Sequence, residues 1–298
     1  MADRPSAEWV IDELVVDRLV AEALPHLVAL PRRRASAGWD CDVWRIGDDL
    51  ALRMPRRSAA VSLVLHEQQV LPVVGPAIEA SGVHVPTPLF LGEPSDAFPR
   101  PWSLVPWFDG SSGISVPREE RRRWASDLAN ALLALHTPAP SQHPRNPFRG
   151  VPLAERSDVV RARLDHVVGV EPSLLARAAL TWTRGVNAEP WGGTPLWIHG
   201  DLHPGNLVSD ASGLRAIIDF GDVTAGDPAC DLASAWLIFD EQGRADFIGA
   251  LGDHYDPVDW TRARAWAVAL SLAMISQSDD NPVYRELGLI SLAEAATD

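Results

Sequence analysis

The pattern of apolar and polar residues predicts a short helix followed by a small sheet. Apolar residues recur at helical spacing among charges over 8–24, which is typical of an amphipathic helix. Alternating segments follow at 27–35, 41–46 and 49–54, separated by glycine-containing turns, and they predict antiparallel strands. A longer helix is expected over 58–80.

The pattern then changes from strands to helices. Apolar runs in the proline-rich stretch 83–107 predict two more strands, and Pro106–Gly110 has the character of a linker. Helical periodicity dominates from Val116 onward. The predicted helices lie near 117–136, 153–168, 172–187, 228–240, 242–252, 257–277 and 282–296.

A predicted hairpin interrupts these helices. Two short apolar runs, Asn206–Ser209 and Leu214–Asp219, are joined by the turn sequence Asp-Ala-Ser-Gly. Strands first and helices later indicate an α+β fold with segregated lobes. We therefore predict a lobe at 1–107 with an antiparallel sheet and a larger, mainly helical lobe at 108–298.

Composition narrows the function classes. The chain has no uninterrupted apolar stretch of about eighteen residues, and its acidic start does not resemble a signal peptide, so neither a membrane protein nor a secreted one is expected. Two cysteines, Cys41 and Cys230, cannot form a disulfide framework, and a reducing cytoplasm fits best. The formal charge of -14 argues against nucleic acid as a partner and favours a cationic small molecule.

All 26 basic residues are arginine. Without lysine, the chain cannot contain a Walker-type phosphate loop, a lysine Schiff base or a Ser-x-x-Lys nucleophile. A GC-rich genome would explain this bias without any functional cause. Whatever its origin, any side-chain cation that clamps a phosphate here must be an arginine.

The strongest chemical signal lies around the predicted hairpin. Asp201 closes the sequence His-Gly-Asp, Asn206 follows five residues later, and Asp219 opens an Asp-Phe-Gly sequence after a further thirteen. Phosphoryl transfer needs a carboxylate that orients a hydroxyl, and oxygen ligands that hold Mg²⁺ on the phosphates. The order and spacing match a kinase catalytic loop and metal site, so we predict a kinase-like fold.

The stretches HGDLHPGN, IDFGD and GDPACDLA resemble the catalytic core of the aminoglycoside phosphotransferase family, and the resemblance extends over nearly the whole chain. It implies that Asp201 is the catalytic base or orienting carboxylate and that His199 structures the catalytic loop. Asn206 and Asp219 would be Mg²⁺ ligands. Asp231 would brace the loop from the next helix.

The same resemblance implies a phosphate clamp in the smaller lobe. Ser36 and Gly38 lie where the family places its nucleotide loop, although the sequence departs from Gly-x-Gly-x-x-Gly. Arg53 occupies the position of the usual lysine, as in macrolide phosphotransferases, and Glu67 would be its partner. Arginine keeps the charge but brings a longer planar fork, which leaves a degenerate, inactive homologue open.

The hinge between the lobes would hold the nucleotide base. Counting back from Gly110, the resemblance assigns the edge of adenine or guanine to the carbonyl of Pro106 and the amide of Phe108. ATP and GTP are both open as co-substrates.

The acceptor is expected to be a small molecule with a hydroxyl. Ten acids and a single base lie between Asp219 and Asp259, which suits a cationic acceptor such as an aminoglycoside, another antibiotic or an amino alcohol. Solvated helix faces would be equally acidic. Asp222, Asp240 and Glu241 are the candidate substrate contacts, and antibiotic resistance is one phenotype that such an enzyme would confer.

Two other functions fit parts of the sequence. A metallohydrolase could use His199, Asp201, His203 and Asp219 as ligands, but it would leave Asn206 and the smaller lobe unexplained. A kinase-like module could bind a nucleotide or ligand without transfer. Asp227, one residue before a proline, is interpreted as a helix cap.

Overall fold

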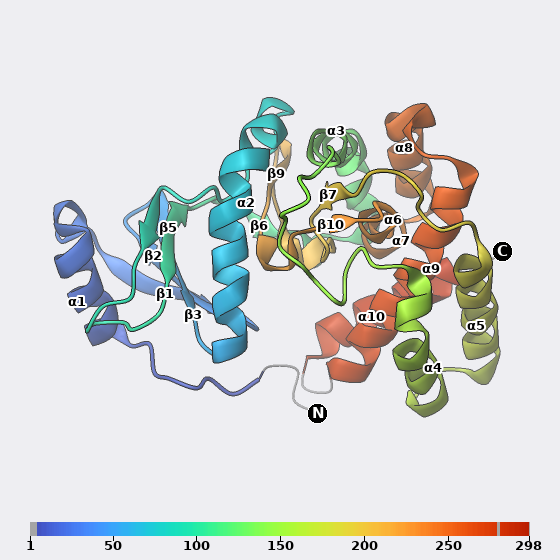
Figure 1. The fold of residues 1–298 in the computed structure, drawn as a ribbon, viewed down its shortest axis with the longest axis horizontal. Helices are drawn as coiled ribbons and strands as arrows, with labels where there is room; N and C mark the ends of the chain where they lie inside the picture. Colours follow the sequence, from blue (N-terminus) through green and yellow to red (C-terminus); the bar gives the residue numbers. More distant parts are fainter. Residues whose placement is uncertain (1–4, 279–280, 298) are drawn as a thin grey trace.

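The smaller lobe is built around an antiparallel sheet of five strands. The computed structural model describes residues 5–278 and 281–297. The strand order is β1-β2-β3-β5-β4, so β5 lies between β3 and β4, and β4 is an edge strand. The sheet lies beside α1 at one end of the molecule (Figure 1). The strands are β1 (Arg32–Ala37), β2 (Cys41–Ile46), β3 (Leu50–Pro55), β4 (Phe90–Gly92) and β5 (Trp102–Pro106).

One helix closes an apolar core against this sheet. α1 (Glu13–Ala23) begins where the Asp12 carboxylate accepts a hydrogen bond from the Val15 backbone, so it starts later than the predicted residue 8. Its buried residues belong to one cluster with Leu52 and Trp102 of the sheet. The predicted strand 27–35 was displaced, because a 3₁₀ turn at Pro25–Leu27 precedes β1.

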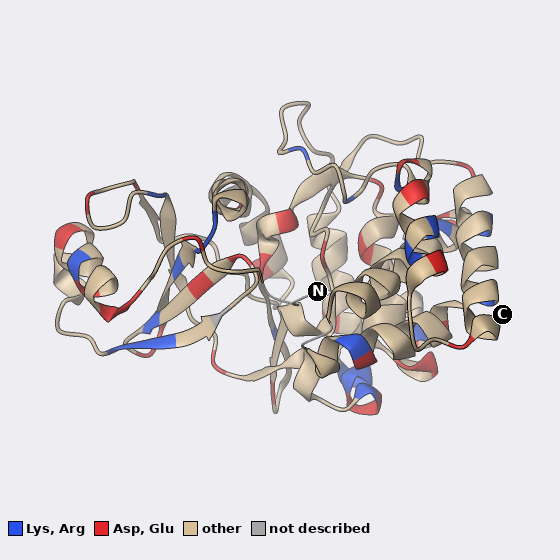
Figure 2. Cartoon of the chain, turned by 90° about the horizontal axis from the view of Figure 1, so that it is seen from below, with Lys and Arg blue, Asp and Glu red and all other residues tan. Residues whose placement is uncertain are grey.

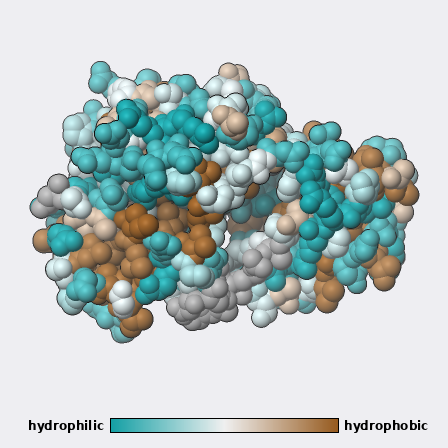
Figure 3. All heavy atoms as spheres, turned by 180° about the vertical axis from the view of Figure 1, so that it is seen from behind, coloured by the Kyte–Doolittle hydropathy of each residue, from teal (hydrophilic) through white to brown (hydrophobic). Residues whose placement is uncertain are grey.

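A second helix links the two lobes. α2 (Val61–Ala80) follows β3, and its buried residues Leu71, Val74 and Ile78 join the core of the larger lobe. The apolar core therefore crosses the predicted lobe boundary, and the division at residue 107 stays a prediction. From behind, a hollow separates the lobes, and apolar residues gather beside it on the larger lobe (Figure 3).

The larger lobe is mainly helical. α9, which runs through its centre, is buried along most of its length, and α5, α6 and α10 all pack on it. Short 3₁₀ segments precede α3 and α4, and the predicted helix 228–240 is divided between α6 and α7. The helices are α3 (Ala125–Leu135), α4 (Ser157–His166), α5 (Pro172–Asn187), α6 (Ala229–Leu232), α7 (Ser234–Ile238), α8 (Glu241–Leu251), α9 (Pro257–Gln277) and α10 (Pro282–Ala295).

Two small sheets position the catalytic segments. β8 (Leu207–Asp210) and β9 (Gly213–Ile217) form the predicted hairpin, and β6 (Ser111–Ser112) pairs with β8. The pattern did not predict β7 (Leu196–Ile198) and β10 (Thr224–Gly226), which pair across the catalytic segment. In the described part of the chain, no helix is long and apolar enough to cross a membrane.

Candidate active site

A buried carboxylate holds the catalytic loop from behind. Asp231, at the α6 helix, is fully buried, and its two oxygens accept the backbone N–H groups of His199 at 2.7 Å and Gly200 at 2.8 Å. Nε2 of His136 lies 3.1 Å from the same carboxylate, and Nδ1 of His136 lies 2.6 Å from the Tyr255 hydroxyl. Asp231 thus lies where the family resemblance expects its bracing aspartate.

His199 is a structural residue of this loop. Its Nδ1 accepts the backbone N–H of Asp201 at 3.2 Å, and its Nε2 donates to the carbonyl of Ile218 at 3.0 Å. Both ring nitrogens are therefore used, which leaves no lone pair for a metal. Among the residues described, no group of three or more His, Cys, Asp or Glu side chains could hold a metal ion. These contacts speak against the metallohydrolase.

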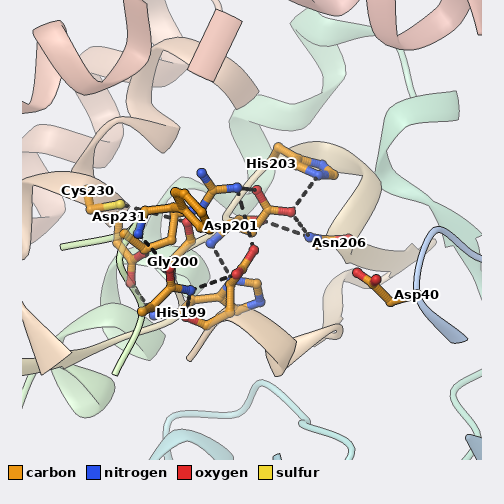
Figure 4. Close-up of polar contacts among 12 residues, drawn as sticks. Asp40, His199, Gly200, Asp201, His203, Asn206, Cys230 and Asp231 are labelled. Carbon is orange, nitrogen blue, oxygen red and sulfur yellow. Dashed lines mark hydrogen bonds and ion pairs between the residues drawn. The ribbon is translucent and has the colours of Figure 1, made fainter. Parts of the chain in front are cut away.

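The Asp201 carboxylate points toward His203 and Asn206 (Figure 4). Its side chain is 29% exposed, Arg149 Nη2 donates to its Oδ1 at 2.9 Å, and His203 Nε2 lies 3.4 Å from Oδ2. Burial alone would raise the pKa of the Asp201 carboxyl, but the charges of Arg149 and His203 outweigh it and hold the pKa well below its ordinary value. Asp201 is therefore an ionised carboxylate that can accept a hydrogen bond from an alcohol.

Asn206 and Asp219 lie beside Asp201. The side-chain N–H of Asn206 donates to the backbone carbonyl of Asp201 at 2.8 Å. The backbone carbonyl of Asn206 accepts the N–H of Ile218 at 2.9 Å. The next residue, Asp219, has φ 64°, the one positive φ among the non-glycine residues that are described. Such left-handed backbone is strained outside glycine and often marks functional sites. The segments that carry Asp201, Asn206 and Asp219 are thus joined by hydrogen bonds.

The oxygen donors present here fit a magnesium ion. The amide nitrogen of Asn206 is used within the loop, so its side-chain oxygen is the atom left for a cation. The Asp219 carboxylate, half exposed, supplies a second hard oxygen ligand. Mg²⁺ in kinases takes one or two protein oxygens and completes its shell with phosphates and water, so a pair of ligands is sufficient.

Arg53 bridges the two lobes. Its Nε donates to Oε2 of Glu67 at 2.6 Å, and its Nη2 donates to Oδ1 of Asp219 at 2.6 Å. Lysine carries its three rotatable donors on one nitrogen, so it could not make these two contacts from separate nitrogens of a rigid, planar fork. Burial raises the pKa of Glu67 to about 7, although the charge of Arg53 and hydrogen bonds from Arg53 and from the Phe220 backbone oppose this rise. The predicted Arg53–Glu67 pair is present in the structure.

The predicted nucleotide loop is tied to the strand that carries Arg53. A bulge between Arg34 and Ser36 bends β1 just before the loop. The carbonyl of Gly38 accepts a hydrogen bond from Arg56 Nη1 at 2.8 Å. Asp40, at the end of the turn, faces the catalytic loop across from Asn206, and its carboxylate accepts from Arg57 Nε at 2.8 Å (Figure 4).

The hinge is anchored from both sides. Pro106 pairs with Leu50 at the end of the sheet, and the ring of Phe108 stacks on His84 with centroids 5.6 Å apart. His84 in turn forms a parallel bridge to Ala216 of β9. The assignment of the Pro106 carbonyl and the Phe108 amide to the nucleotide base stays a prediction.

Two of the three predicted substrate acids are engaged by other groups of the protein, and the third lies on the surface of a helix. Asp222 lies near Asp201, but its carboxylate accepts from Asn146 at 2.7 Å and lies 3.5 Å from Arg149. Asp240 caps α8 by accepting the Gly243 N–H at 2.8 Å, and Glu241 is an exposed residue of the first turn of that helix. These contacts favour local structural roles. Acidic residues are also spread over both lobes (Figure 2).

Sequence reasoning missed Arg149 and His136. Arg149 lies in the long loop before α4, where no motif or periodicity marks it. The signal that could have led to it was the absence of lysine, which requires an arginine wherever the site needs a cation. Asp227 lies one residue before the N-cap of α6, which is Pro228; its carboxylate accepts the Ala229 N–H at 3.0 Å and forms an ion pair with Arg262.

Residues 32–266 match the model of the phosphotransferase enzyme family, APH. The chain belongs to this family, and its enzyme class is phosphotransferase. The match includes the catalytic loop, the Asp-Phe-Gly segment and the sheet with Arg53, which are the parts assembled above.

Two curated proteins show what the chain is similar to. YcbJ of Bacillus subtilis, an uncharacterized protein, is 25% identical over 228 residues, which cover 72% of this chain and 69% of YcbJ. Thiamine kinase of Escherichia coli K12 is 29% identical over 175 residues, and these cover 56% of each protein. The match therefore spans little more than half of thiamine kinase.

Solved structures share the fold over almost the entire length. The GDP complex of aminoglycoside 2'-phosphotransferase-IIIa superimposes with a TM-score of 0.71 at 18% identity, covering 96% of this chain and 99% of that one. Macrolide 2'-phosphotransferase MphH from Brachybacterium faecium gives a TM-score of 0.60 at 21% identity, with coverages of 93% and 98%. The bilobal, kinase-like α+β fold predicted from the sequence is confirmed.

Proposed function

We propose that this protein is a magnesium-dependent small-molecule kinase that transfers the γ-phosphate of ATP or GTP to an alcohol. The observation that carries the proposal is the ionised Asp201 carboxylate, which is held by Arg149 and whose backbone carbonyl accepts a hydrogen bond from Asn206. Transfer breaks the bond between the γ-phosphorus and its bridging oxygen and forms a bond to the acceptor oxygen. The hydroxyl proton leaves through Asp201.

Each residue of the site would make a different contribution. Asp201 accepts a hydrogen bond from the acceptor hydroxyl and aligns its oxygen with the γ-phosphorus. Asn206 and Asp219 would hold Mg²⁺, which neutralises charge on the phosphates when it is bound. Arg53 would turn from Asp219 toward the phosphates while Glu67 keeps its Nε in place. The bracing by Asp231 keeps the loop from shifting during transfer.

A cationic acceptor is the second, finer candidate. The net charge of -14 supports it, and so do relatives named for thiamine and aminoglycosides. Antibiotic resistance would follow if the acceptor were a drug. The contacts of Asp222 and Asp240 do not favour those residues as its binding groups. A cytoplasmic location fits the two cysteines, which are buried and unpaired.

Nucleotide binding and transfer can be tested separately. Thermal-shift titrations with ATP and with GTP, each with and without Mg²⁺, should raise the melting temperature only when metal and nucleotide are both present. Transfer from γ-labelled nucleotide to a panel of amino alcohols, hydroxy acids, sugars, kanamycin and a macrolide should then yield a labelled product. Binding without transfer to any alcohol would favour the non-catalytic module, and tightly bound zinc or iron in the purified protein would favour the hydrolase.

A further inference from the structure

A row of arginines leads away from the catalytic carboxylate. Arg149 contacts Asp201, Arg156 lies in the 3₁₀ turn before α4, and Arg163 lies seven residues further, two helical turns along. The Arg156 guanidinium lies over the ring of Phe148, 5.2 Å from its centre. Residues seven apart share one face of a helix, so Arg156 and Arg163 extend the row in one direction.

The electrostatics agree with this placement. Burial lowers the pKa of Arg156, and the positive charge of Arg149 lowers it further. Burial likewise lowers the pKa of Arg163, followed by the charges of Arg156 and Arg149. Arg156 is also within electrostatic reach of Cys230, whose sulfur lies 3.8 Å from the Gly200 carbonyl, so the row begins beside the catalytic loop.

Arg156 and Arg163 differ in their partners from other partly buried arginines of this acidic protein. Arg45, Arg57 and Arg244 each form an ion pair with a carboxylate at 2.5–2.8 Å, and Arg118, which has no acidic partner either, donates to the backbone carbonyls of Trp236 and Phe239. Within the part of the chain that is described, neither Arg156 nor Arg163 forms an ion pair with any acid. Partial burial of unpaired like charges is costly, and an anion bound between them would offset that cost.

The inner end of the row lies at Asp201, which Arg149 contacts. On the opposite side, α10 begins close to the catalytic loop, where the ring of Tyr284 packs edge-on against His203. The next residue, Arg285, donates to the Val168 carbonyl at 2.8 Å and so closes the outer end between α4 and α10. An acceptor whose hydroxyl reached Asp201 would therefore extend along the arginine row.

We infer that the acceptor carries an oxyanion, a carboxylate or a phosphate, that binds to Arg156 and Arg163 while its hydroxyl lies at Asp201. The guanidinium fork matches both kinds of oxyanion in a bidentate manner, and Arg149 at the inner end serves the catalytic carboxylate. The inference rests on the proposed kinase function and specifies its acceptor as an anionic alcohol, contrary to the cation suggested by net charge.

Matched acceptor pairs test the charge directly. With Mg²⁺ and the nucleotide that the protein binds, initial rates are measured for glycerate against glycerol and for ribose 5-phosphate against ribose, with kanamycin and thiamine as cationic acceptors. The anionic member of at least one pair should have a kcat/KM at least about tenfold above its neutral partner, the scale of one charged hydrogen bond. Its KM should rise with ionic strength, because salt screens partly exposed charges.

Substitutions on α4 provide the matched control. Arg156→Gln and Arg163→Gln should each raise KM for the anionic acceptor about tenfold or more while KM for the nucleotide stays unchanged. Arg161→Gln removes the same charge from the same helix, but Arg161 is exposed and lies near Asp158, so it should leave both KM values unchanged.

Several results would overturn the inference without touching the kinase proposal. Transfer to kanamycin or thiamine with all anionic alcohols inert would be one, and equal responses of Arg156→Gln and Arg161→Gln would be another. Absence of nucleotide binding, in contrast, would remove the proposed function itself.

Discussion

Two regions meet at the catalytic loop, and their charged side chains differ in burial and in the number of partners. Behind the loop, Asp231 is fully buried, and its oxygens are occupied by two backbone N–H groups and His136. In front, Asp201 is 29% exposed, and Arg156 and Arg163 have no acidic partner among the described residues. Behind the loop, the charged side chain has all its hydrogen-bond partners and so fixes the geometry of the loop. In front of it, charged side chains lack partners, and a substrate would supply the missing contacts. One aspartate, Asp231, is thus placed to stabilise the loop, and the other, Asp201, is the one we propose for the chemistry.

The largest effect should come from the front of the loop. Asp201→Ala is expected to lower kcat at least about a thousandfold, because the acceptor hydroxyl loses its orienting carboxylate, while melting temperature and nucleotide affinity stay near those of the wild type. Steady-state kinetics with the acceptor found above, together with calorimetry, would measure both. A variant that turns over at a comparable rate would remove Asp201 from the chemistry.

A substitution behind the loop should affect the fold instead. Asp231→Ala leaves two buried N–H groups and His136 without their acceptor, and the free energy of unfolding should fall by about 3–5 kcal/mol. Urea denaturation measures this, and Asp246→Ala, which removes an exposed partner of Arg122, is the control that should leave the urea midpoint unchanged. If both variants were equally stable, the hydrogen bonds of Asp231 would not be what holds the catalytic loop in place.

Arg149 connects the two regions, and its effect should depend on pH. The Arg149 charge helps hold the pKa of Asp201 below its ordinary value, so the carboxylate is ionised across the working range. In Arg149→Gln the opposing effect of burial gains weight and this pKa rises, so kcat/KM should fall several-fold more at pH 5 than at pH 8. Arg149→Lys should restore part of the low-pH activity. A uniform loss at all pH values would mean that Arg149 acts without influencing Asp201.

A last effect concerns Glu67, which is buried in the smaller lobe. Because its folded-state pKa is raised from 4.5 to about 7, its protonated form contributes stability that is fully present below pH 4.5 and lost as pH rises through about 7. Glu67→Gln cannot ionise, so the wild type should lose up to about 3 kcal/mol relative to the variant between pH 4.5 and 8. Urea denaturation across this range tests the sign. A wild type that gained stability relative to the variant would show that the Arg53 charge outweighs burial.

Local sequence patterns predicted most helices and the hairpin, but they did not predict every boundary of these elements. The helix over 172–187 and the hairpin after Asn206 followed from periodicity and from turn residues, which act locally. β7 and β10 escaped detection, since each is three residues long and exists because the other pairs with it. The first helix began later than its apolar pattern suggested, because the cap at Asp12 decides where hydrogen bonding starts.

What the sequence alone determined was the kinase-like order of chemistry: the spacing of Asp201, Asn206 and Asp219, and the requirement that every side-chain cation be an arginine. Tertiary structure decided which groups those residues meet. Arg149 reaches Asp201 from a loop 52 positions earlier, and Arg53 reaches Asp219 across 166 positions. Contacts between such distant segments depend on how the lobes pack, and no local periodicity carries that information. The charge that would face the proposed acceptor is likewise set by the tertiary structure, which the net charge of the chain does not reveal.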